Sequence, residues 1–211
     1  MKRIFLLILP LLAACGPRYG LRVPEHVVME LPYETRVELL EAENELALAI
    51  DKVDQASSEI LRARDNIRRA RSRANAAGQE LDRAEDAVSR EVAQLTIDEA
   101  EARVEFLRAR QRLNVALLEV EQLALRCAFG RFELARVTAA RKAKVAGIED
   151  LDPKEFEAQV SECDAEVKGM RAELGADTAD EKAAREAWEA KKAALAKRTF
   201  DARTSPYVEN L

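Results

Sequence analysis

Apolar residues recur with a period of seven along most of the chain. Between residues 39 and 95 every seventh residue is apolar, and alanine stands three residues after each of the first seven. The two sets are Leu39, Leu46, Val53, Ile60, Ile67, Ala74, Leu81, Val88, Leu95 and Ala42, Ala49, Ala56, Ala63, Ala70, Ala77, Ala84. A seven-residue repeat with two apolar positions indicates a coiled coil. Alanine lets a partner helix approach closely, so we expect another helix to cover this alanine seam.

The repeat shifts by four residues near residue 90 and then continues in two further segments. One contains Val92, Leu95, Ala102, Phe106, Ala109, Leu113, Ala116, Val120, Leu123, Cys127, Leu134 and Val137, and the other Phe156, Val160, Cys163, Val167, Met170, Leu174, Ala184, Trp188 and Leu195. A shift of this size is a stutter, which locally unwinds a supercoil. The whole pattern predicts an all-α protein, a long antiparallel helical hairpin or coiled coil.

Local signals place the ends of the predicted helices. Thr35-Arg36-Val37-Glu38 is a capping box. Gly147 is typical of a helix end, and Asp152-Pro153 of the next helix start. We therefore predict a coiled-coil region over 35–203, with a long helix at 35–146, a turn at 147–152 and a return helix at 153–203. Residues 204–211 are predicted to be a C-terminal tail.

The return helix is too short to cover the whole first helix, so the alanine seam needs a second partner. One solution is a second turn at Asn75-Ala76-Ala77-Gly78, which gives a three-helix bundle. The other is a continuous helix over 36–146, about 165 Å long at about 1.5 Å per residue, with another chain on the seam. The register passes Gly78 without a phase change, which favours the continuous helix.

Residues 1–14 have the pattern of a secretory signal peptide. Lys2 and Arg3 precede the apolar run Ile4–Leu12, which is too short to span a bilayer as a helix. The following Leu12-Ala13-Ala14-Cys15 resembles the lipobox of bacterial lipoproteins at all four positions. The resemblance implies that Cys15 becomes the first residue, carries diacylglycerol and an N-acyl chain such as palmitate, and anchors the protein in a bilayer.

The residues after Cys15 bear on where the protein resides. Gly16 in place of Asp implies, by analogy with enteric lipoproteins, the outer membrane, facing the periplasm; the inner membrane and the cell surface are the alternatives. Residues 15–34 include three prolines without a helical period, which predicts an extended tether. His26, the only histidine, lies there and is interpreted as a solvated residue.

Cys127 and Cys163 fall on seam positions of a protein expected in an oxidising compartment. A symmetric turn would place Cys127 opposite residue 172, about 14 Å along the axis from Cys163. An intrachain disulfide therefore needs an asymmetric loop. Buried thiols or an interchain bridge are the alternatives.

Charge and composition narrow the function. The net charge is −5, and it becomes −7 when residues 1–14 are removed with Lys2 and Arg3, which does not suit nucleic-acid binding. The basic cluster, Arg62, Arg64, Arg68, Arg69, Arg71 and Arg73, is interpreted as a helix face paired with acidic residues such as those of 80–91. Lipid phosphates or an acidic partner are the alternative. No catalytic, phosphate-binding or metal-ligating motif is found, so we expect no enzyme, cofactor or small-molecule substrate.

Two functions suit these features. The first is a structural or scaffold lipoprotein, similar in plan to the major outer-membrane lipoprotein of enteric bacteria, with itself or another helical envelope protein as partner. The second is an accessory subunit of an envelope transport or secretion complex. The hairpin is similar to that of periplasmic adaptors of such systems, although the chain lacks the alternating pattern of their β-rich domains. A lipoprotein that activates a cell-wall enzyme is a third alternative, without a sequence mark of its own.

Overall fold

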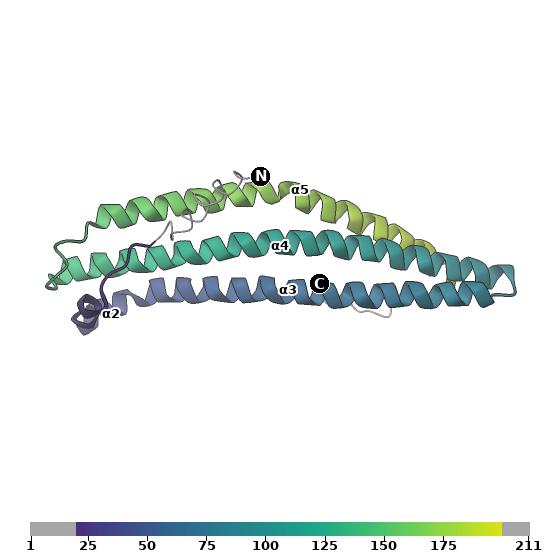
Figure 1. Ribbon diagram of the computed structural model, residues 1–211, viewed down its shortest axis with the longest axis horizontal. Coiled ribbons are helices and arrows are strands. Elements are labelled where there is room, and N and C mark those ends of the chain that lie inside the picture. The colour runs from purple at the N-terminus through teal and green to yellow at the C-terminus, as the bar shows by residue number, and fades with distance from the viewer. Residues whose placement is uncertain (1–19, 200–211) are drawn as a thin grey trace, which may run out of the picture. The chain divides into compact units, whose positions relative to one another are not determined.

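The computed structural model describes residues 20–199 (Figure 1). The predicted signal peptide, Cys15 and the predicted tail at 204–211 lie outside these residues. The described helices are α1 (Glu25–Met29), α2 (Tyr33–Glu38), α3 (Leu40–Arg83), α4 (Ala87–Ala143) and α5 (Pro153–Thr199). α4 packs antiparallel against α3 and α5 in a bundle-like arrangement of three long helices. The prediction of an all-α fold with antiparallel long helices is confirmed.

The chain reverses between α3 and α4, so the preferred prediction of one continuous helix over 35–146 is wrong. The three-helix arrangement of the alternative prediction is confirmed. Its turn at Asn75-Ala76-Ala77-Gly78 is wrong, because these residues are inside α3 and the turn lies at residues 84–86. Asp86 caps α4: its Oδ1 accepts the Ser89 N–H at 2.8 Å and its Oδ2 the Ser89 hydroxyl at 2.6 Å. The phase shift near residue 90 therefore marks a turn and not a stutter.

The alanine seam is covered within the chain. Ala49, Ala63, Ala70 and Ala77 are between 0 and 9% exposed in α3, which packs against α4. The four-residue slip reflects the change of helix: α4 presents its own stripe to the seam of α3. Because α4 covers this seam, no second chain is required there, as it would be for a continuous helix.

The described chain forms two compact units. Unit 1 contains residues 20–50 and Leu123–Val167, and unit 2 contains Asp51–Gln122 and residues 168–199. The core of unit 1 is made of Val23, Val27, Leu31, Leu39, Phe132, Val137, Ala139, Ala140, Val145, Ile148 and Phe156. The core of unit 2 includes Ile67 and Ala70 from α3, Val104, Phe106 and Leu107 from α4, and Trp188 from α5.

The described part of the predicted tether is folded onto unit 1, which corrects the expectation of an extended segment. Val23, Val27 and Leu31 are 5, 0 and 3% exposed, because their four-residue spacing puts all three on one side of α1 and its flanks. Pro24 and Pro32 stand immediately before α1 and α2 and delimit these helices. Thr35 lies inside α2 and is not its N-cap, so the capping box does not start the helix. His26 is exposed, as predicted.

The turn between α4 and α5 is longer than predicted. α4 ends at Ala143, three residues before the predicted end, because Lys144 takes a positive φ of 56°. Gly147 follows with φ 80°, a conformation that suits glycine. Asp152 accepts the Lys154 N–H at 3.0 Å and α5 begins at Pro153, as predicted. α5 then runs unbroken through Gly175.

Candidate functional site

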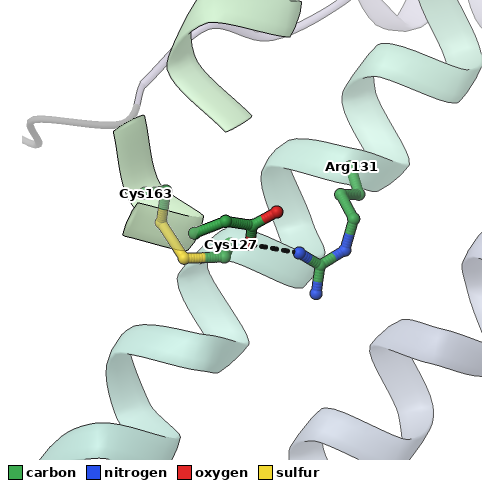
Figure 2. Close-up of a disulfide and its surroundings, with 4 residues drawn as sticks. Cys127, Arg131 and Cys163 are labelled. Atoms are coloured by element: carbon green, nitrogen blue, oxygen red, sulfur yellow. Dashed lines mark hydrogen bonds and ion pairs between the residues drawn. A yellow bond between two sulfur atoms is a disulfide. The ribbon is translucent and has the colours of Figure 1, made fainter. Parts of the chain in front are cut away.

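Cys127 of α4 and Cys163 of α5 form a disulfide in unit 1 (Figure 2). Their Cα atoms are 5.6 Å apart. The predicted separation of the two cysteines along the helix axis applies to a symmetric turn. In the structure the Arg141 guanidinium donates to the carbonyl oxygen of Leu151 at 2.6 and 3.1 Å, so the loop folds back along α4. This asymmetry brings Gly130 next to Val160 and aligns the cysteines.

Arg131, one turn after Cys127, lies beside the disulfide (Figure 2) and forms ion pairs with residues of two other helices. Its guanidinium lies 2.5 Å from Asp164 Oδ1 of α5 and 3.4 Å from Glu45 Oε2 of α3. All three side chains are at least one third exposed, so these ion pairs add little stability individually. They link α4 to both α3 and α5 at the level of the disulfide.

Glu133 holds the N-terminal segment onto α4. Its side chain is only 1% exposed; Oε2 accepts the Val23 N–H at 2.8 Å and Oε1 accepts from Arg136 at 3.1 Å. Arg136 also covers the Phe132 ring at 4.1 Å. A buried carboxylate is tolerated only when its oxygens are bonded, so this residue couples the N-terminal segment to unit 1.

A second contact strengthens this attachment. The Leu21 N–H donates to Gln159 Oε1 of α5 at 3.1 Å. The Arg22 guanidinium lies 4.6 Å from the centre of the Phe129 ring, a cation–π distance. The segment that leads to Cys15 is therefore bonded to both α4 and α5 from Leu21 onward.

Unit 2 contains a buried polar cluster built from all three long helices. Glu99 of α4 is 0% exposed; its Oε1 accepts from Trp188 Nε1 at 2.8 Å, and its Oε2 lies 3.4 Å from Arg73 of α3. Trp188 stacks on Phe106, with ring centres 5.3 Å apart, and Arg103 lies 5.3 Å from the Trp188 ring. Arg73, Glu99 and Trp188 come from three different helices and meet only when these helices are correctly aligned. The cluster is therefore suited to fixing the register of the helices.

The prediction that the basic cluster forms ion pairs is confirmed, but the partners differ from those predicted. Arg62 pairs with Glu59 at 2.7 Å and Arg68 with Asp65 at 3.5 Å, both within α3 rather than with residues 80–91. Arg73 instead reaches the buried Glu99. The cluster is thus a helix face whose pairs are mainly local.

Among the open grooves on the described residues, one on each unit is lined by charged side chains. A groove of 660 Å³ on unit 1 is lined by Arg22, Arg36 and Arg136 together with Glu25, Glu43 and Glu133. A groove of 690 Å³ on unit 2 is lined by Arg71, Arg108 and Lys191 together with Asp98, Glu101 and Glu105. Each of these grooves is therefore lined by equal numbers of acidic and basic side chains.

In the part of the chain that the structure describes, no group of three or more His, Cys, Asp or Glu side chains is arranged to hold a metal ion. Across residues 20–199, no helix is both long and apolar enough to cross a membrane. Comparison with protein-family models, with curated proteins and with solved structures finds no match to this chain.

The burial of Glu99 and Glu133 was not predicted from the sequence. Glu99 stands four residues after Leu95 and three before Ala102, and Glu133 stands four before Val137. These spacings place both carboxylates beside the apolar stripe of α4. A charged residue three or four positions from residues of an apolar stripe indicates a buried ion pair, and this pattern could have identified both glutamates.

Proposed function

We propose that the protein is a lipid-anchored lipoprotein of the periplasm that acts as a helical scaffold in the cell envelope. The observation that carries the proposal is the lipobox-like Leu12-Ala13-Ala14-Cys15 after a short apolar run. The Cys127–Cys163 disulfide supports it, because disulfides persist in oxidising compartments outside the cytoplasm. The three long helices are linked by ion pairs and by the disulfide, an arrangement that suits a mechanical or spacing role.

The attachment of the N-terminal segment suggests how the anchor would act. Four residues separate Cys15 from Gly20, the first described residue, and five extended residues span at most about 18 Å. From Leu21 onward the chain is bonded to Gln159 and Glu133. In this proposal unit 1 lies next to the bilayer and the acyl chains hold a folded body, without a long flexible tether.

An accessory subunit of an envelope transport or secretion complex is the second candidate. The observation that favours it is the antiparallel pairing of α3 with α4 over long stretches, an arrangement similar to the helical hairpins of periplasmic adaptors. A scaffold and an accessory subunit share the anchor and differ in their partners.

The anchor is tested by expressing the full-length chain in a bacterium with a palmitate analogue that can be detected after electrophoresis. We expect the wild-type chain to be labelled and shortened, and Cys15→Ser to remain an unlabelled precursor. The double variant Cys127→Ser/Cys163→Ser is the matched control, because it also loses thiols but keeps the lipobox; it should be labelled. An unlabelled wild-type chain would contradict the proposal.

Crosslinking in intact cells, followed by mass spectrometry, separates the two candidates. Capture of abundant envelope proteins or of the chain itself supports the scaffold. Capture of a transporter or secretion channel supports the accessory subunit instead.

A further inference from the structure

The first residues of α3, together with α2, have two apolar faces, and only one is used inside the chain. Leu39 and Ala49 are 4 and 9% exposed and belong to the face that packs against α4. On the opposite face large apolar side chains remain open to solvent. They are Tyr33, Val37, Leu40 and Leu48, which are 77, 48, 52 and 60% exposed, with Ile50 beside them at 46%.

The open face has coiled-coil spacing. Tyr33, Val37, Leu40, Asn44 and Ala47 follow one another at alternating intervals of four and three residues, the spacing of d and a positions. All five are exposed, and we call them the outward seam. Asn44 occupies an a position, where asparagine is known to set register and favour two-stranded pairing at a cost in stability.

We propose that the outward seam is the interface between two copies of this chain, paired as a short parallel coiled coil in the membrane-anchored form. The inference rests on the proposed lipid anchor. Two copies anchored through residue 15 in one leaflet would both start at the same surface. Their outward seams would then run in the same direction, with Asn44 facing Asn44 of the second copy.

Charges beside the outward seam favour this occupant. In a parallel pair, the g position of one helix lies opposite the next e position of the other. Arg36 is at g and Glu41 at e, so each copy would place an arginine opposite a glutamate of the other. Both side chains are exposed. Arg36 also donates to the carbonyl oxygens of Leu31 and Met29, which fixes its position near the start of the seam.

The same charges disfavour the bilayer as the occupant. Glu34, Glu41 and Glu43 are exposed beside the outward seam, and a negative rim is repelled by anionic headgroups. Because the seam covers only about two heptads, the pair would be weak in free solution. Anchoring in one leaflet raises the effective concentration of the second copy, so we expect dimers at the membrane and monomers after detergent extraction and dilution.

Cysteine crosslinking in membranes tests the proposal. Leu40→Cys is introduced into the full-length chain, cells are treated with a mild oxidant, and covalent dimers are measured by non-reducing electrophoresis beside the lipid label. Glu157→Cys is the matched control, an exposed position of α5 in the same unit. We expect a dimer for Leu40→Cys and a monomer for Glu157→Cys. Adding Val37→Glu to Leu40→Cys should abolish the dimer through like charges across the seam.

The outcomes separate the two proposals. A lipid-labelled Leu40→Cys chain that stays monomeric, couples to a different protein, or dimerises no more than Glu157→Cys overturns the outward-seam dimer and leaves the anchor intact. A chain without the lipid label overturns the proposed function, whatever the crosslinking result. A labelled dimer specific to Leu40→Cys and lost with Val37→Glu supports both.

Discussion

The carboxylate of Glu133 accepts the backbone N–H of Val23 at 2.8 Å, although 110 residues separate them in the sequence. Through this bond a buried charge of α4 fixes the segment that leads to the proposed lipid anchor. The bond therefore attaches the backbone at Val23 to α4 within unit 1.

Replacing Glu133 should loosen the N-terminal segment. In Glu133→Ala the Val23 N–H loses its acceptor inside the protein, which costs about 1–3 kcal/mol of unfolding free energy. Denaturant unfolding followed by circular dichroism measures the change. Glu133→Gln, which keeps an oxygen for Val23 but loses the charge opposite Arg136, should fall between wild type and Glu133→Ala. Equal stability of all three proteins would contradict the role assigned to Glu133.

Removing the disulfide should lower stability substantially. Cys127 and Cys163 are 36 positions apart, and closing a loop of that length is worth about 4 kcal/mol in the chain-entropy model. We expect the Cys127→Ala/Cys163→Ala variant to unfold at a lower guanidinium concentration than the wild type. A reductant should lower the wild-type midpoint and leave that of the variant unchanged; a wild-type midpoint insensitive to reductant would argue against the bond.

Removing the buried Glu99 of unit 2 should destabilise the protein more than removing the exposed Glu105 of the same helix. Glu99→Ala leaves Trp188 Nε1 without its acceptor and removes the carboxylate facing Arg73. Breaking a buried ion pair from one side costs about 3 kcal/mol or more. Glu105→Ala removes an exposed partner of Arg108 on the same helix and should cost less than about 1 kcal/mol. Similar thermal shifts for both variants would refute the structural importance of Glu99.

Asp86 should make the start of α4 sensitive to acid. Hydrogen bonds from the Ser89 hydroxyl, and then from its backbone N–H, lower the pKa of Asp86 below its ordinary value. Because the folded pKa is the lower one, the stabilisation is present above the unfolded pKa of about 3.9 and is lost as the pH falls through the folded pKa. Asp86→Ala should therefore lower the melting temperature at pH 7, and the difference from wild type should shrink as the pH falls below the unfolded pKa and through the folded pKa. A difference of constant size would show that Asp86 acts without its charge.

Two glycines should respond to alanine in opposite directions. Gly78 is inside α3, and an added Cβ would meet no atom within 4 Å, so Gly78→Ala should stabilise the protein by up to about 1 kcal/mol. Gly147 has φ 80°, where alanine is strained by about 1–2 kcal/mol, so Gly147→Ala should destabilise it. Urea unfolding of both variants checks the pair, and destabilisation by Gly78→Ala would indicate a turn at that position.

Much of the fold could be predicted from the sequence because helical periodicity is a local property. The apolar stripes predicted that Leu39, Ile60 and Ala70 would be buried, and they are. Asp152 and Pro153 predicted the start of α5 because a cap bonds to residues adjacent in sequence. The same periodicity did not locate the turn at residues 84–86, since two antiparallel helices can continue one heptad pattern with only a shift of phase.

What only the tertiary structure decided depends on contacts between residues distant in sequence. The pairing of Cys127 with Cys163 follows from the loop between α4 and α5, which Arg141 holds against the end of α4. A periodic pattern does not specify how such a loop folds. The N-terminal segment looked extended because its prolines were conspicuous, yet Glu133 and a shared apolar core hold it. Glu99 looked like one more surface charge of a charged helix. It is buried where Trp188 donates a hydrogen bond to its Oε1 and Arg73 forms an ion pair with its Oε2, both from other helices.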